Sequence, residues 1–151
     1  MTRASKCLAT ALFALASSVA PGCSPAVPTS MLIDIESMLV VPDDLDGLRI
    51  EVIGAESAAT GMGGMLDQTF PLAAPFPATY RVFPHAGYES ESVTITVDGL
   101  LGGARRIRRV VTSAFVPGAE VIVRVDLARD CVGVTCPPGI DCVLGRCVET
   151  M

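Results

Sequence analysis

Apolar side chains recur at every second position along this chain from Met31 onward, the spacing of β-strands with one buried face. The clearest runs lie at residues 48–52, 93–97 and 121–127, where Val, Ile and Leu alternate with polar or charged residues. No window of ten or more residues beyond residue 30 has the pattern of a helix. The alternation therefore predicts an all-β fold of short strands.

Further strands are expected at 33–35, 68–72, 80–82 and 106–115, the last with a bulge near Val110 and Val111, where the alternation slips. Turn-forming residues separate the runs at 42–47, 61–64, 98–103 and 117–118. About seven strands in roughly 100 residues favour an antiparallel β-sandwich of immunoglobulin-like or transthyretin-like type, with a small barrel as the alternative. Four aromatic residues are expected to fill its core: Phe70, Tyr80, Phe83 and Phe115.

The first 22 residues have the form of a signal peptide. Arg3 and Lys6 precede an uncharged apolar run that is too short for the roughly 20 residues of a permanent membrane span. The segment Ala20-Pro21-Gly22-Cys23 resembles a bacterial lipobox, although Ala20 and Pro21 depart from its usual residues. This resemblance implies a diacylglycerol with palmitate-type acyl chains on Cys23. Ordinary cleavage after Ala20 and retention of the leader are the alternatives.

These features divide the chain into a signal peptide (1–22), a lipidated tether rich in Pro and small residues (23–30), a sandwich domain (31–129) and a cysteine-rich tail (130–151). In bacterial lipoproteins, an Asp directly after the lipidated cysteine favours retention in the inner membrane. Ser24 occupies that position here, so the analogy implies the outer membrane, with the domain facing the periplasm or the surface. Removal of the leader changes the net charge from −5 to −7, because Arg3 and Lys6 leave with it. An acidic chain is a poor candidate for binding nucleic acid.

The tail contains Cys131, Cys136, Cys142 and Cys147 in the spacing C-x4-C-x5-C-x4-C. A segment this short cannot form a hydrophobic core of its own, so cross-links must hold it. Two disulfides are expected, in a pairing that the spacing leaves open. A zinc site is the weaker alternative, because paired C-x2-C motifs are missing.

The run from residue 121 to residue 127, followed by Ala-Arg-Asp-Cys-Val-Gly-Val-Thr-Cys-Pro-Pro-Gly and a closing Gly145-Arg-Cys147, resembles small predicted lipoproteins of myxobacteria and related bacteria. The Cys136-Pro-Pro-Gly and Gly145-Arg-Cys147 pieces are also similar to fragments of EGF-like modules. The resemblance implies an envelope address and a β-sandwich with a four-cysteine tail. It supplies no reaction.

Two groups of charged residues and one histidine are candidate sites. Arg105, Arg106, Arg108 and Arg109 form the one cationic cluster, which could meet lipid phosphate or an acidic envelope protein, or could be solvent-facing strand positions. The one histidine, His85, is expected in an exposed loop, with no Gly-x-Ser-x-Gly motif to support a hydrolase. Asp43, Asp44 and Asp46 are expected to form a polar turn rather than a calcium site, because the EF-hand register fails.

The sequence thus predicts a non-enzymatic cell-envelope lipoprotein that needs no cofactor or metal and serves as a structural or protein-interaction module. A periplasmic ligand- or glycan-binding module and an accessory domain of an envelope enzyme system are the alternatives. The arginine cluster and the tail are the predicted partner surfaces.

Overall fold

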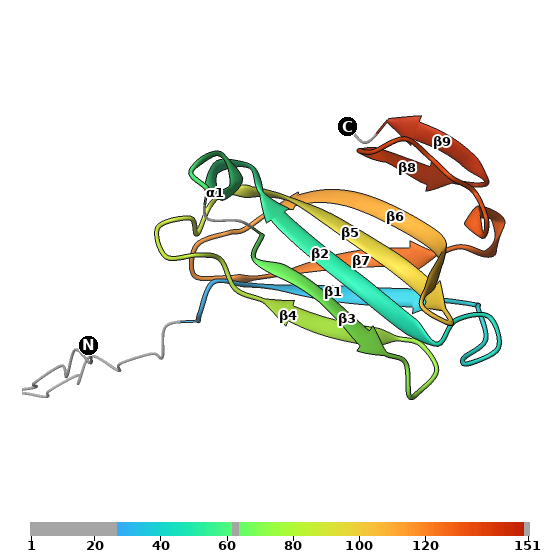
Figure 1. Ribbon diagram of the computed structural model, residues 1–151. Coiled ribbons are helices and arrows are strands. Elements are labelled where there is room, and N and C mark those ends of the chain that lie inside the picture. The colour runs from blue at the N-terminus through green and yellow to red at the C-terminus, as the bar shows by residue number, and fades with distance from the viewer. Residues whose placement is uncertain (1–26, 62–63, 150–151) are drawn as a thin grey trace, which may run out of the picture.

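The computed structural model describes residues 27–61 and 64–149 and contains two facing β-sheets with a small hairpin at one end (Figure 1). One sheet has the order β4-β1-β7 and the other the order β3-β2-β5-β6. The seven sandwich strands are β1 (Ser30–Ser37), β2 (Gly47–Gly54), β3 (Leu66–Pro71), β4 (Ala78–Val82), β5 (Ser92–Leu101), β6 (Ala104–Ala114) and β7 (Glu120–Leu127). The predicted β-sandwich is therefore confirmed.

The sheet pairing is antiparallel except between β1 and β7, which run parallel from Ser30 beside Glu120 to Ser37 beside Leu127. If the seven strands are lettered A to G in chain order, the two sheets have the strand orders C-B-E-F and D-A-G. Constant-type immunoglobulin domains have ABED and CFG. The architecture is that of a sandwich, but the strand order differs from the immunoglobulin one.

The inward faces of the strands form one continuous core, as the period-two alternation predicts. Phe115 is buried in it, and the rings of Phe70 and Tyr80 pack at a tilt of 41° with centroids 4.4 Å apart. Phe83, however, is 54% exposed, so its predicted place in the core is wrong. Tyr80 and Val82 point inward from β4, and the residue after Val82 must face outward. The fully buried side chains of this core include Met31, Ile33, Ile35, Leu45, Leu48, Ile50, Val52, Ile95, Val97 and Leu127.

The turn expected at Asp98-Gly99 is instead part of β5, and the chain reverses at Gly102-Gly103. Gly99 lies where β5 touches the core: a Cβ there would stand 2.6 Å from Ile107 Cγ2 and 2.9 Å from Leu45 Cδ1. Glycine is therefore needed at this position because of the close packing, although the chain does not turn there.

The bulge of β6 also lies elsewhere than predicted. The register shifts where Gly99 pairs with Ile107 and Leu100 with Arg105, which leaves Arg106 as the extra residue. Val110 and Val111 pair regularly with β5. The alternation slips there because Val111 packs against the core while Val110, on the opposite face, is also buried.

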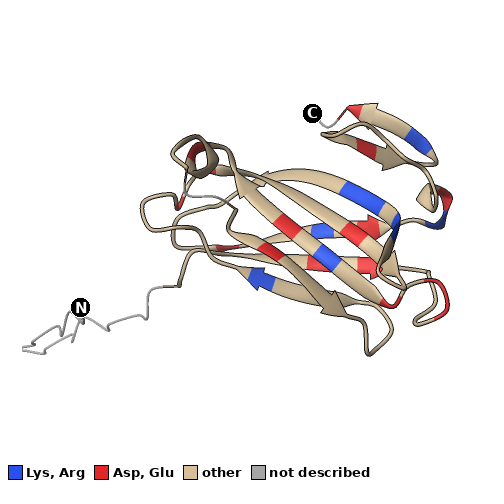
Figure 2. Ribbon diagram, in the orientation of Figure 1, with Lys and Arg blue, Asp and Glu red and all other residues tan. Residues whose placement is uncertain are grey.

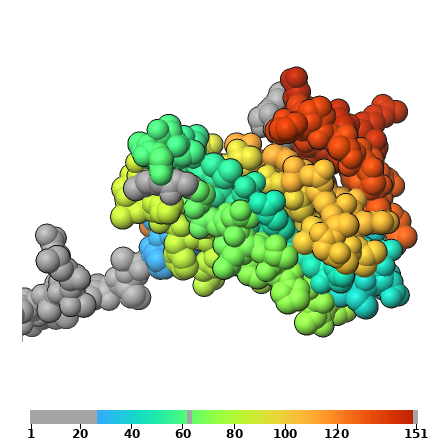
Figure 3. Space-filling model, viewed as in Figure 1, coloured from blue at the N-terminus to red at the C-terminus, as the bar shows by residue number. Residues whose placement is uncertain are grey.

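A short helix, α1 (Ala55–Ala59), follows β2. After β7 comes a 3₁₀ turn, η1 (Arg129–Cys131), and then the hairpin of β8 (Ile140–Val143) and β9 (Arg146–Glu149). This tail lies against the β6 side of the sandwich, at the end opposite the N-terminus (Figures 1 and 3). We call the end where β1 starts the tether end and the other the distal end. By the rise of about 3.3 Å per residue, the eight residues of β1 separate them by about 26 Å.

Candidate functional site

The two disulfides of the tail join Cys131 to Cys142 and Cys136 to Cys147. Cys131 is fully buried, Cys142 is 3% exposed, and both belong to the hydrophobic core of the sandwich. The predicted disulfides are confirmed. The first of them connects η1 to β8 inside the core, so the tail is a part of the sandwich rather than a separate appendage.

Asp141 attaches the tail to the edge of β6. Its carboxylate accepts hydrogen bonds from Arg109 Nε at 3.0 and 3.1 Å and from the backbone N–H of Val110 at 3.0 Å. Arg109 also donates to the carbonyl of Asp126 in β7 at 2.7 Å, so one guanidinium connects both sheets and the tail. Because the Asp141 and Arg109 side chains are only 6% and 16% exposed, each needs the other as a partner for its charge.

A second hydrogen bond links the tail to β6 at the bulge. The Gly133 N–H donates to the carbonyl of Arg106 at 2.8 Å. The tail therefore satisfies backbone groups along β6, which is the last strand of its sheet. Edge strands present unpaired backbone groups that promote association with other chains, and a covering segment removes that hazard.

The predicted arginine cluster is divided by the structure. Arg109 faces inward, whereas Arg108 faces outward and binds Asp98 through two hydrogen bonds of 2.6 and 2.7 Å. These hydrogen bonds, which Arg108 donates to Asp98, raise the pKa of the Arg108 guanidinium, against a smaller lowering by burial. Arg105 and Arg106 are exposed and form no ion pair within the described part of the chain. Of the four arginines in the cluster, only Arg105 and Arg106 remain open to a partner.

A row of alternating charges crosses the outer face of the four-stranded sheet (Figure 2). Asp67 of β3 binds Arg49 of β2 at 2.9 Å, Arg49 pairs in register with Asp98 of β5, and Asp98 binds Arg108 of β6. The hydrogen bond from Arg49 lowers the pKa of the Asp67 carboxyl. Each charge of the row has a neighbour of opposite sign, and Glu51 lies 3.9 Å from Arg49 on the same face. The ion pairs therefore connect neighbouring strands of the sheet.

The carboxylate of Glu91 is buried at the start of α1. One oxygen accepts the N–H groups of Glu56 and Ser57 at 3.1 and 3.0 Å. The other has no hydrogen-bond partner in the described residues. Gly54 makes room for this carboxylate, because a Cβ there would lie 2.2 Å from a Glu91 oxygen. Glu91 thus orders the β2–α1 junction.

His85 lies in the loop between β4 and β5, as predicted, but it is half-buried rather than exposed. Its carbonyl accepts the N–H of Tyr88. Its Nε2 has no hydrogen-bond partner in the part of the chain that the structure describes.

The carboxylates of the acidic turn at residues 43–46 accept hydrogen bonds from backbone N–H groups. Asp44 accepts the N–H of Val40 at 2.9 Å and pairs with Arg129, and Asp46 accepts the N–H of Gly102 at 2.7 Å. No group of three or more His, Cys, Asp or Glu side chains is placed to hold a metal among the residues described. The turn therefore acts in folding, by connecting the β1–β2 loop to the β5–β6 turn and to η1.

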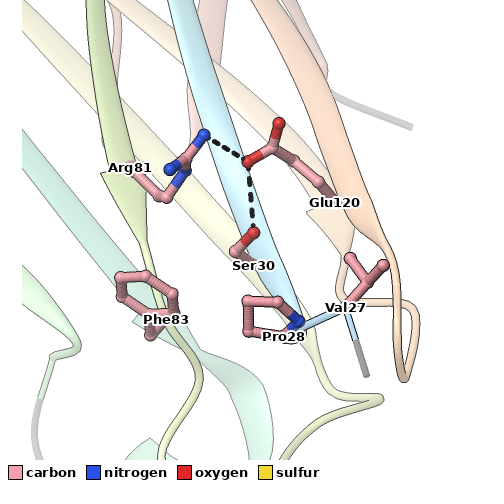
Figure 4. A pocket seen from close by; sticks show the side chains of 6 residues that line it. All are labelled: Val27, Pro28, Ser30, Arg81, Phe83 and Glu120. Carbon is pink, nitrogen blue, oxygen red and sulfur yellow. Dashed lines mark hydrogen bonds and ion pairs between the residues drawn. The ribbon is translucent and has the colours of Figure 1, made fainter. Parts of the chain in front are cut away.

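A hollow of about 240 Å³ opens at the tether end, on the outer face of the β4-β1-β7 sheet (Figure 4). An ion pair of 2.8 Å between Arg81 and Glu120 crosses its middle, and the Ser30 hydroxyl donates to the same Glu120 oxygen at 3.3 Å. Apolar side chains form its border: Val27, Pro28 and Phe83. No motif in the sequence indicates this site, although the alternation in β4 already directs Phe83 outward.

The chain is held to the sandwich from residue 29 onward at this end. Thr29 Oγ1 accepts the N–H of Gly118 at 2.8 Å, and the Ser30 N–H donates to the carbonyl of Ala119. β1 then begins at Ser30, the last residue of the expected tether. The expected signal peptide (1–22), which contains Cys7, and residues 23–26 of the expected tether, which contain Cys23, lie outside the described residues. Within residues 27–61 and 64–149, no helix has the length and hydropathy to cross a membrane.

Fold and disulfides together define a class: a two-sheet β-sandwich whose edge is closed by a cross-linked tail. Comparison with protein families, curated proteins and solved structures found no match to this chain. The resemblance to myxobacterial lipoproteins stays a prediction.

Proposed function

We propose that the protein is a non-enzymatic, lipid-anchored module of the bacterial cell envelope that binds a protein partner through its distal end. The observation that carries the proposal is the pair of disulfides, one of them built into the core. Such cross-links form and persist in oxidising compartments, to which a signal peptide delivers a chain. Cys23, two residues after Pro21 and directly after Gly22, is the residue proposed to carry the lipid.

The distal end is the proposed partner surface because it lies opposite the point where the tether enters. Exposed Arg105 and Arg106 lie there, beside the turn at Gly102-Gly103. A hollow of about 470 Å³ near η1 adds Met38, which is 88% exposed. Its other lining residues include Arg129, which is paired with Asp44, and the acids Asp126 and Asp130. About 26 Å from the tether end, Arg105 and Arg106 face away from the phosphates of their own membrane. An acidic envelope protein is therefore the favoured partner.

Cell fractionation tests the anchor. The full chain is expected in the membrane fraction, and the Cys23→Ala variant is expected to leave it, because the acyl chains supply the binding energy. A Cys7→Ala variant is the matched control and should behave as the parent. Equal distribution of the parent and the Cys23→Ala protein would contradict the proposed anchor.

A further inference from the structure

Exposed apolar side chains gather at the tether end of the sandwich. Val27, Phe83 and Ile122 are 57%, 54% and 60% exposed, and Pro28 lies between the first two at the border of the hollow (Figure 4). Ile122 belongs to the same outer face, since it pairs with Leu32 of β1 two positions beyond Glu120. We call these four residues the tether patch. Clustered apolar side chains of this kind indicate a surface that is covered by something else.

We propose that the tether patch rests on the bilayer that carries the lipid anchor, with Phe83 and Val27 inserted among the lipid headgroups. This inference depends on the proposed lipidation of Cys23. It assigns the bilayer surface as the ligand of the patch and orients the domain with its distal end away from the membrane.

The short segment between Cys23 and Val27 limits how far the domain can lie from the bilayer. Three residues separate Cys23 from Val27. At the maximum extension of 3.3–3.6 Å per residue, Val27 lies within about 14 Å of Cys23. The headgroup layer is roughly 5–8 Å thick on each side of the hydrocarbon. A domain held this closely cannot stand away from the bilayer, and the part of it nearest the anchor is the tether patch.

The charged groups at the tether patch are paired with each other. Arg81 and Glu120, the charged residues that line the hollow, form an ion pair of 2.8 Å with each other. The hollow therefore brings no net charge to the membrane, and a paired charge costs less to desolvate than an isolated one. Attraction to anionic lipid is not needed, so binding should depend on apolar contact and little on the lipid charge or on salt.

The anchor explains how so small a patch can stay bound. A few apolar side chains give weak membrane binding by themselves, but a covalent link to the bilayer makes their insertion an intramolecular step with a high effective concentration. We therefore expect docking of the lipidated protein only.

A tryptophan reporter tests the proposal, because the chain contains no tryptophan. Phe83→Trp protein is purified in its lipidated form and incorporated into phosphatidylcholine vesicles, with or without brominated acyl chains. We expect blue-shifted emission and loss of most of the fluorescence in the brominated vesicles, with the same result when phosphatidylglycerol is added. Val27→Trp, which lies outside any strand and does not disturb the fold, should respond in the same way.

Met38→Trp is the matched control, since this side chain is 88% exposed and follows β1 at the distal end. It should emit as a water-exposed indole and escape quenching. If intact mass shows diacylglycerol on Cys23 and positions 83 and 27 are quenched no more than position 38, the docking is wrong while the anchor stands. A blue shift without quenching, in particles of doubled mass, would assign the patch to a second copy and also overturn it. Absence of diacylglycerol would remove the proposed anchor and the docking together.

Discussion

Replacement of both cysteines of the Cys131–Cys142 disulfide by alanine is expected to lower the free energy of unfolding by about 3–5 kcal/mol. The same replacement at Cys136–Cys147 should cost less, about 2–3 kcal/mol. Each disulfide joins residues 11 positions apart, so the restriction of the unfolded chain is nearly equal for both. The difference comes from burial, because only the first pair lies entirely within the core, where alanine leaves a cavity.

Urea unfolding of the two double-alanine variants, measured beside the parent protein, gives both values. The matched loop lengths make each variant the control for the other. Equal losses of stability would show that Cys131 and Cys142 are not part of the core, and a larger loss at Cys136–Cys147 would contradict the described packing of the tail.

Asp141→Ala is expected to cost about 3–5 kcal/mol, because it leaves a buried guanidinium without its partner. The substitution removes both hydrogen bonds from Arg109 Nε and the one from the Val110 N–H. Asp141→Asn keeps an acceptor for the N–H but loses the charge, so it should fall between the parent and the alanine variant. Thermal or urea unfolding measures the loss.

Hydrogen exchange gives a readout that a general loss of stability would not reproduce. The amides of Val110 and Gly133 should exchange faster in Asp141→Ala, relative to amides of β2, because the tail separates locally from β6. Asp67→Ala is the control, since its ion pair with Arg49 lies on the solvent-exposed face and should contribute far less. An Asp141→Ala protein as stable as Asp67→Ala, with unchanged exchange at Val110, would mean that Asp141 does not hold the tail.

The sequence predicts the strands correctly where buried and exposed side chains alternate with a period of two. The alternation at Leu48, Ile50 and Val52, and again at Val93, Ile95 and Val97, predicts two strands of the core, because each has one face inside and one outside. The disulfides were predictable from an even set of closely spaced cysteines. Their pairing was not, because the spacing is nearly symmetric and three-dimensional packing decides which thiols meet.

Arg109 shows why the site was harder to predict than the fold. Four arginines close in sequence suggested one cationic surface, but strand geometry sends Arg108 and Arg109 to opposite faces. The inward position of Arg109, between Ile107 and Val111, indicates that it needs a buried partner. That partner, Asp141, is 32 residues away in a segment without a regular pattern, and no local signal connects the two.

At Phe83 of the tether patch, residue type and strand period predict opposite positions. Phe83 was expected in the core because large aromatic side chains are usually buried. The period of β4 places it outside, and the structure follows the period. A mismatch between what a side chain prefers and where its strand directs it therefore marks the surface that we propose meets the membrane.

The intact mass of the natively expressed protein, before and after reduction, tests the central claim most directly. The account predicts a chain that begins at Cys23, carries a diacylglycerol, and gains the mass of four hydrogens when its two disulfides are reduced. A mass equal to that of the whole 151-residue chain, unchanged by reduction, would contradict both the lipid anchor and the cross-linked tail.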